Sequence, residues 1–293
     1  MLIISRNICN FAYLKKKKME KTKILFVSQE ITPYTTETEM SVIGRYLPQG
    51  IQEKGNEIRT FMPKYGNINE RRNQLHEVIR LSGMNIIINE TDNPLLIKVA
   101  SIQSARMQIY FIDNEEFFQR KYILQDSEDK YFDDNDERAI FFARGVLETV
   151  KKLRWAPDIV HCHGWVTNLI PLYIKKAFKE DPLFNNSKVI YSIYDDDFTG
   201  SLNKDYKNRL VIEGVENEHI DVLENPNFIN VTKMAVNMSD AVIYGSKKIN
   251  NTLDKFVKET GKPILEYQNQ EQYIDAYSVF YNEILKEQHV KTH

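Results

Sequence analysis

The chain is poor in the residues that mark several protein classes. It has 2 cysteines, 11 glycines and 9 prolines among 293 residues. Cys9 and Cys162 cannot form a disulfide framework and are typical of a reducing compartment, although one pair stays open. So few glycines and prolines argue against a many-stranded all-β protein, which needs many turns. These scarcities favour a cytoplasmic protein outside the all-β class.

The chain also lacks an excess of charge of either sign. Lys and Arg number 39 and Asp and Glu 41, which gives a formal net charge of −2 at pH 7. A nucleic-acid-binding surface needs clustered positive charge, so we expect no nucleic-acid partner. The hydrophobic share of 42% and the charged share of 27% are those of a soluble globular protein, not of a disordered chain or a membrane bundle. A chain of this length builds one large domain or two small ones.

Residues 1–18 form a segment of different composition. A short apolar stretch is followed by four lysines and then by Met19. The stretch is too short to span a bilayer, and its basic residues are on the wrong side for a secretory signal. Three interpretations remain: translation begins at Met19, the segment is a disordered basic tail, or its lysines attach it weakly to a membrane surface. We exclude it from the fold and expect no membrane partner.

From Lys23 onward, apolar runs of strand length alternate with helical patterns. Residues 24–28 precede a polar loop and a helical pattern over 40–51, and a strong helix is expected through 141–150. The further runs are residues 58–63, 84–89, 96–102, 108–113, 159–164, 189–194 and 241–246. Those between 84 and 113 follow one another without helices, which indicates a β-rich insertion or sheet edge. The rest predicts an α/β fold with a doubly wound parallel sheet.

In a doubly wound sheet, ligands bind at the carboxyl ends of the strands. Functional residues are therefore expected directly after the runs, in the stretches 28–38, 161–167, 194–200 and 245–248. None of these stretches contains GxGxxG or GxxxxGK[ST]. The sequence thus shows neither the dinucleotide-binding fingerprint nor the phosphate-binding loop.

Several segments in this order resemble the N-terminal lobe of bacterial glycogen and starch synthases. The most specific are PDIVHCHGW from Pro157 and MAVNMSDAVIYGS from Met234, and the resemblance stays in register over residues 23–253. It implies a GT-B glycosyltransferase architecture, in which two Rossmann-like lobes hold ADP-glucose and glucose is added to an α-1,4-glucan without a metal or other cofactor. Residues 19–262 would then be a single Rossmann-like lobe of a truncated and degenerate member.

Several positions at which the family places functional residues differ here. Where it has Lys-x-Gly-Gly after the first strand, residues 36–39 are Thr-Glu-Thr-Glu, so carboxylates would face the diphosphate. Gly164 stands in place of an aspartate. Tyr194 and Asp195 stand in place of His-Asn, whose histidine contacts the sugar. No catalytic residue is therefore assigned. By the resemblance, the positions expected to bind substrate are Glu30, Thr36, His161, His163, Trp165 and Tyr194.

Residues 262–285 carry apolar side chains at helical spacing. By the resemblance, the second lobe would be expected to begin near this point, and the last helix of GT-B enzymes returns to the first lobe. We therefore interpret residues 263–288 as that returning C-terminal helix, kept after an internal loss of the second lobe. It is expected to pack near residues 40–54 and 139–153.

Some of these residues allow other interpretations. His161 and His163 form an H-x-H pair that could ligate a metal, but a third ligand is not evident nearby, so no metal is expected. The three aspartates 195–197 resemble the acidic metal-binding motif of other glycosyltransferases, or form a solvated turn. Cys162 is interpreted as a packed thiol. Trp165 either covers the core or stacks on a sugar ring.

Functions of three classes remain open. The chain transfers glucose with a second polypeptide that supplies the other lobe, or it binds an α-glucan or another carbohydrate without catalysis, or it is a scaffold or regulator with a protein partner on the exposed cleft face. The interpretation we favour is a glycogen or starch synthase-like protein of glucan metabolism that is not active alone.

Overall fold

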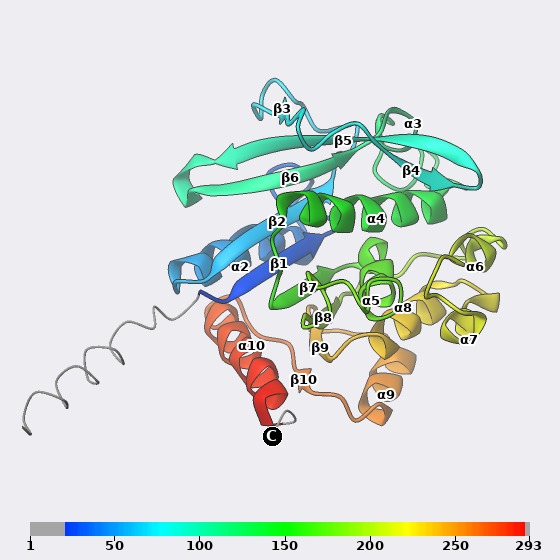
Figure 1. Cartoon of the computed structure of the whole chain (residues 1–293). Coiled ribbons are helices and arrows are strands. Elements are labelled where there is room, and N and C mark those ends of the chain that lie inside the picture. The colour runs from blue at the N-terminus through cyan, green and yellow to red at the C-terminus, as the bar shows by residue number, and fades with distance from the viewer. Residues whose placement is uncertain (1–20, 291–293) are drawn as a thin grey trace, which may run out of the picture.

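The computed structural model describes residues 21–290, and the side chains up to residue 286. The expectations for residues 1–18 lie outside the described residues. A ten-stranded sheet runs through the described part (Figure 1). Its parallel strands have the spatial order β10 (Ile264–Leu265), β9 (Ala241–Tyr244), β8 (Lys188–Ile193), β7 (Ile159–His163), β1 (Lys23–Ser28), β2 (Glu57–Pro63) and β6 (Met107–Asp113).

The far edge of the sheet beyond β6 is antiparallel. β5 (Thr91–Ile102) pairs with β6, and β3 (His76–Glu77) and β4 (Met84–Ile88) pair with β5. This confirms the β-rich edge indicated by the runs between residues 84 and 113. The doubly wound α/β class is confirmed as well, because the parallel strands are joined through helices.

Helices cover both faces of the sheet. The α-helices are α2 (Glu39–Glu53), α3 (Glu115–Phe118), α4 (Asn135–Leu153), α5 (Leu169–Lys175), α6 (Tyr206–Arg209), α7 (Asn217–Ile220), α8 (Phe228–Asn237), α9 (Asn251–Glu259) and α10 (Tyr273–Val290). Short 3₁₀ helices are η1 (Gln103–Ala105), η2 (Trp165–Thr167) and η3 (Asp221–Glu224).

The alternation of side chains along the strands decides which helix lies on which face. On one face, Phe26 is paired in register with His161, and helices α2 and α10 cover these side chains. On the other face, Ile112 lies against Gly145 of α4. Figure 1 shows α4 crossing over the sheet and α10, in red, next to β1. The apolar core lies on both sides of the strands, and its buried residues form one cluster.

Helix α2 has a capping box at its N-terminus, formed by Thr38 and Ser41. The Thr38 hydroxyl accepts from the Ser41 amide at 3.0 Å, and the Ser41 hydroxyl accepts from the Thr38 amide at 2.8 Å. Reciprocal bonds of this kind satisfy two amides that an uncapped helix leaves free. A β-carbon at Gly44 would lie 2.7 Å from the Glu30 carbonyl oxygen, so only glycine lets α2 approach the end of β1 this closely.

Helix α10 packs beside α2 rather than between two helices. Ile274 lies against Gly50, and Asp275 forms an ion pair with Lys54 at 2.5 Å. The expected contact with residues 40–54 is therefore present, but the expected contact with 139–153 is wrong, because α4 covers the opposite face. The helix also begins at Tyr273 and not at the expected residue 263, because residues 264–265 form β10, a two-residue strand that extends the sheet at β9.

Candidate functional site

The stretches expected to carry function meet at one edge of the sheet. The Gln29 amide donates to the His163 carbonyl at 3.0 Å, and the Gln29 side-chain oxygen accepts from the Val166 amide at 3.1 Å. The Asp195 amide donates to the Ser246 hydroxyl at 3.2 Å. These bonds join the segment after β1 to the segment after β7, and the segment after β8 to the segment after β9. The stretches in which functional residues were expected thus lie at one edge of the sheet, and their role in binding stays a prediction.

The segment before α2 presents negative charge to this edge. Thr36, Glu37 and Glu39 are exposed. The Thr38 hydroxyl, besides capping the helix, donates to a Glu30 carboxylate oxygen at 2.9 Å. A helix N-terminus normally attracts an anion through its free amides and its dipole. Here a hydroxyl occupies one amide and carboxylates surround the terminus, so a diphosphate would meet repulsion.

Gly164 has a backbone that favours glycine and a neighbour that excludes a side chain. Its φ of 85° lies in the left-handed region. A β-carbon there would lie 2.7 Å from the Met40 sulfur and 2.9 Å from the Gln29 Oε1. An aspartate at this position would therefore be strained and would clash with both side chains. Met40 and Gln29 fill the space that such a carboxylate would need.

The two histidines of β7 lie inside the protein, behind the edge. His161 Nδ1 is 2.6 Å from the Tyr281 hydroxyl and its Nε2 is 2.7 Å from the Ser192 hydroxyl. His163 Nδ1 is 2.8 Å from the Tyr194 hydroxyl. Burial lowers the pKa of His163 to about 3, and burial and His163 together lower the pKa of His161 well below its usual value. Both imidazoles are neutral at physiological pH, and neither is accessible to a substrate in solution.

Tyr194 occupies the end of β8. It is buried, and a β-carbon on Gly245 would lie 2.4 Å from its Cε1 atom. The phenol ring thus lies directly on the Gly245 backbone, and its hydroxyl points back to His163. In this position the side chain closes the edge between β8 and β9 and offers no free hydrogen-bonding group to a ligand.

The aspartates after β8 differ in their surroundings. Asp195 and Asp197 are exposed, whereas Asp196 is half-buried and accepts from the Trp165 amide at 3.3 Å. Burial raises the pKa of Asp196 to about 8; the Trp165 amide opposes this and the carboxylates of Glu30 and Asp197 add to it. The folded protein therefore favours the protonated form of Asp196.

Little space remains beside the N-terminus of α2. A hollow of about 30 Å³ lies between Glu39, Gly245 and Tyr273. Small-molecule sites in proteins measure about 300–1,000 Å³. The hollow has room for water but not for a nucleotide sugar.

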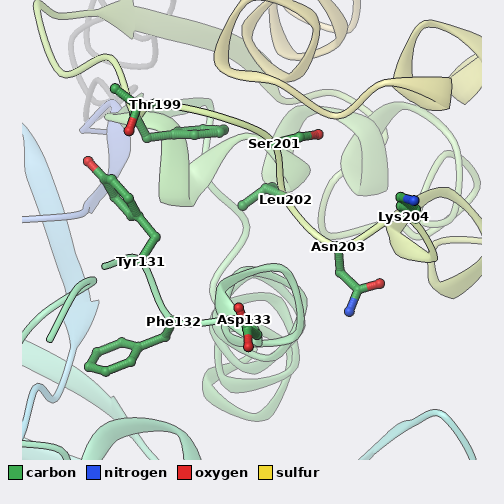
Figure 2. A pocket seen from close by; sticks show the side chains of 9 residues that line it. Tyr131, Phe132, Asp133, Thr199, Ser201, Leu202, Asn203 and Lys204 are labelled. Atoms are coloured by element: carbon green, nitrogen blue, oxygen red, sulfur yellow. The ribbon is translucent and has the colours of Figure 1, made fainter. Parts of the chain in front are cut away.

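A larger pocket lies beside this edge, where two loops face each other. It has a volume of about 400 Å³ and is formed by the loop before α4 and the loop after β8 (Figure 2). Its lining residues are Tyr131, Phe132, Asp133, Phe198, Thr199, Ser201, Leu202, Asn203 and Lys204. Trp165 is buried beneath it, with its ring centroid 4.8 Å from that of Phe198. The aromatic surfaces of the pocket therefore come from Tyr131, Phe132 and Phe198 and not from Trp165.

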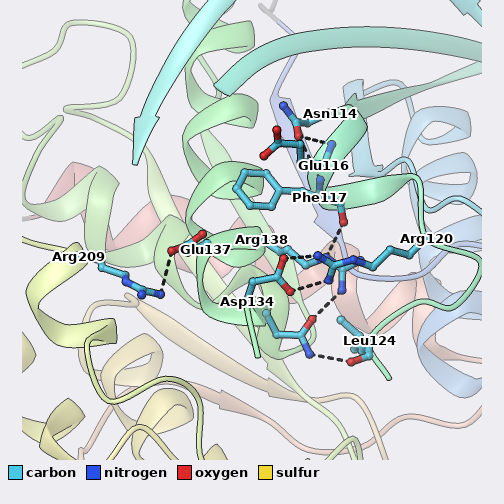
Figure 3. A network of polar contacts seen from close by, with 10 residues as sticks. Asn114, Glu116, Phe117, Arg120, Leu124, Asp134, Glu137, Arg138 and Arg209 are labelled. Carbon is cyan, nitrogen blue, oxygen red and sulfur yellow. Dashed lines mark hydrogen bonds and ion pairs between the residues drawn. The ribbon is translucent and has the colours of Figure 1, made fainter. Parts of the chain in front are cut away.

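A polar network holds the first wall of the pocket in place (Figure 3). Arg120 binds both oxygens of Asp134, and the Asn135 side-chain Nδ2 donates to the Leu124 carbonyl at 2.7 Å. The buried Arg138 donates to the Phe117 carbonyl at 2.7 Å. Burial lowers the pKa of Arg138 to about 10, so its guanidinium stays charged at neutral pH.

The second wall is fastened to the same helix. Arg209 of α6 forms ion pairs with Asp136 at 2.5 Å and with Glu137 at 3.0 Å. Asp136 is fully buried, and charged partners in such a setting hold two elements in a fixed geometry. Both walls of the pocket are thus anchored on the first turn of α4.

No sequence pattern predicted this pocket. Tyr131 and Phe132 lie in the acidic run 126–137, which has no period that would indicate an element. The available signal was a pair of aromatic residues inside a polar loop, because such residues pack or bind and rarely stay in solvent.

Among residues 21–290, no group of three or more His, Cys, Asp and Glu side chains is arranged to hold a metal ion. None of the helices in this range is long and apolar enough to cross a membrane.

The fold of this chain is similar to that of a solved protein, and its sequence matches a known family. The catalytic domain of Starch Synthase IV from Arabidopsis thaliana, solved bound to ADP and acarbose, superposes with a TM-score of 0.68 at 16% identity, over 85% of this chain and 52% of that chain. The described residues thus have the fold of one lobe of a GT-B glycosyltransferase.

Residues 23–261 match the model of the starch synthase catalytic domain, and the chain belongs to this family. The glycogen synthase of Chlorobium luteolum is 38% identical over 176 residues, which are 59% of this chain and 35% of that protein. The glycogen synthase of Chlorobium chlorochromatii is 38% identical over 178 residues, 59% of this chain and 36% of that protein. The chain spans about a third of the length of these relatives.

Proposed function

We propose that the described lobe binds an α-glucan in the pocket between the loops at Tyr131 and Asn203, and that it does not by itself transfer glucose from ADP-glucose. Membership in the starch synthase family supports a role in glucan metabolism. The acarbose bound to Starch Synthase IV supports an oligosaccharide as the ligand class. The free thiol of Cys162 supports the cytoplasm as the place of action.

The shape and chemistry of the pocket support carbohydrate binding. Its volume of about 400 Å³ falls within the range of small-molecule sites. The rings of Tyr131 and Phe198, 6.1 Å apart, offer apolar surfaces on which the C–H face of a sugar can lie. Asp133, Asn203 and Lys204 supply acceptors and donors for hydroxyl groups.

The observation that carries the second half of the proposal is the acidic, capped start of α2. Transfer from a nucleotide sugar needs positive charge or free backbone amides at the diphosphate. Two unit charges 4 Å apart interact by about 1 kcal/mol in water and by about 4 kcal/mol near a protein surface. Glu30, Glu37 and Glu39 would repel a diphosphate placed at this terminus, and the hollow beside Glu39 holds only about 30 Å³.

The test incubates the purified full chain with labelled ADP-glucose and glycogen. We expect the protein to sediment with glycogen without incorporation of label. Incorporation of label into glycogen would overturn the proposal that the lobe does not transfer glucose. Failure to sediment with glycogen and to bind maltoheptaose would overturn the glucan site, and would favour a protein partner on the cleft face.

A matched pair of variants locates the glucan site. Tyr131→Ala removes an aromatic wall of the pocket, whereas Tyr122→Ala makes the same change at a 41% exposed tyrosine outside its lining. An aromatic contact is worth about 1 kcal/mol, so Tyr131→Ala should raise the Kd for maltoheptaose about fivefold. Tyr122→Ala should leave that Kd unchanged. Equal effects of both variants would show that the sugar binds elsewhere.

A further inference from the structure

A second cavity lies at the opposite edge of the sheet. It has a volume of about 340 Å³ and is formed where β2 and β6 begin, where β5 ends, and beside the end of α2. Its lining residues are Gln52, Ile58, Arg59, Ser101, Ile102, Gln103, Arg106, Met107, Gln108 and Tyr110. None of these residues lines the glucan pocket. The cavity is thus separate from the site at the carboxyl ends of the strands.

The cavity carries positive charge that the surrounding side chains only partly balance. Arg106 is exposed, and none of the carboxylates described for this chain forms an ion pair with it. Arg59 lies 3.7 Å from a Glu57 oxygen that also accepts from the Trp155 indole at 2.6 Å. Glu57 is thus turned toward Trp155 and balances one of the two guanidinium groups at most.

Two polar atoms at this cavity are buried without a hydrogen-bond partner. One is the Arg59 Nε, a donor, and the other is the Gln52 Oε1, an acceptor. The Gln52 amide group is oriented by a long hydrogen bond of 3.5 Å from its Nε2 to the Arg106 carbonyl. Both atoms have almost no solvent-accessible surface, so a ligand reaches them when the two side chains turn toward the cavity, and pairing with them then adds affinity. The donor needs an acceptor, and Gln52 Oε1 needs a hydroxyl or an amine.

We propose that this cavity binds a small polyhydroxylated anion, a molecule that carries a phosphate or carboxylate beside hydroxyl groups. The anionic group lies between Arg59 and Arg106, because paired guanidinium groups suit the geometry of both oxyanions. A hydroxyl of the ligand donates to Gln52 Oε1. Ile58 and Tyr110 supply an apolar floor for its carbon skeleton. The site is independent of the proposed glucan pocket, and either proposal can fail alone.

The experiment compares four probes on the full chain by isothermal titration calorimetry. They are glucose 1-phosphate, gluconate, inorganic phosphate and glucose. We expect at least one of the two hydroxylated anions to bind with a Kd of about 1 mM or below. Inorganic phosphate should bind several-fold more weakly and glucose not at all. Binding of glucose 1-phosphate alone identifies phosphate as the anionic group, and binding of gluconate alone identifies carboxylate.

Three variants test the assignment of residues. Arg106→Gln removes an exposed guanidinium and should weaken binding of the hydroxylated anion about tenfold. Arg80→Gln makes the same change at another exposed arginine and should have no effect. Gln52→Leu should reduce the affinity for the hydroxylated anion to that for inorganic phosphate, because only the hydroxyl contact is lost.

Three results would overturn the proposal. The first is no binding of either hydroxylated anion at about 10 mM. The second is an equal effect of Arg106→Gln and Arg80→Gln, which would indicate binding through general surface charge. The third is inorganic phosphate binding as tightly as the hydroxylated anions, which would remove the role of Gln52.

Discussion

Replacement of Asp196 by asparagine should make the protein more stable at alkaline pH. Burial raises the pKa of this carboxyl from 3.8 to about 8, which means that the folded state prefers its protonated form. In the unfolded chain the group ionises near pH 4. The unfolded state therefore binds fewer protons between these values, and the free energy of unfolding falls as the pH rises from about 4 to about 8.

The size of this loss follows from the shift. About 4 pKa units at about 1.4 kcal/mol each give an upper limit of about 6 kcal/mol. The Asp196 side chain keeps some contact with solvent, which screens the charge, so we expect about half of this limit, ~3 kcal/mol. Asp196→Asn keeps an oxygen that accepts from the Trp165 amide and removes the ionisation.

Urea denaturation at intervals between pH 4.5 and pH 9 measures this effect. The difference in the free energy of unfolding between Asp196→Asn and the parent protein should grow with pH through about pH 8 and level off above it. Asp195→Asn, at the exposed neighbouring position, is the control and should show no such trend. A constant difference across the range, or one that shrinks as the pH rises, would refute the reasoning.

Two further predictions concern packing at β7 and β8. Tyr281→Phe leaves His161 Nδ1 without its hydroxyl partner in a buried setting, so the free energy of unfolding should fall by about 1–2 kcal/mol. Gly245→Ala drives a methyl group into the Tyr194 ring and should destabilise the protein by about 1–3 kcal/mol. Both effects are measured by chemical denaturation.

Each of these two predictions has its own control. Tyr267→Phe removes a hydroxyl from a partly buried tyrosine near the start of α10 and should cost less than Tyr281→Phe. Gly245→Ala should cost less when it is introduced into Tyr194→Ala than into the parent protein, because the double variant no longer contains the clash. Strict additivity of the two changes would show that the contact with the ring is not the cause.

Much of the fold could be predicted because apolar runs and turn residues report local structure. The buried runs at β1, β7 and β8 and the periodic helices α2 and α4 satisfy the same local rules in many folds. The face on which a helix lies depends on contacts distant in sequence, and so the partner of α10 was only half predicted. β10 has just two residues, Ile264 and Leu265, and carries no periodic signal.

The sequence predicted which loops meet at the candidate site, but not which of their side chains are exposed there. Strand order fixes which loops meet, and the segments after β1, β7 and β8 do meet. Exposure depends on tertiary packing. His161 and His163 were expected to bind substrate, yet the structure places both in the interior, where they contact Tyr281 and Tyr194. The roles of Glu30, Thr36 and Trp165 stay predictions, since no bound ligand tests them.

The contact between His161 and Tyr281 joins residues 120 positions apart in the chain. During synthesis at about 5–20 residues per second, β7 leaves the ribosome on the order of ten seconds before the helix that covers it. Through this interval the side chains of β1 and β7 that α10 covers stay open to water. We therefore expect the chain to be most prone to aggregation before α10 packs onto them.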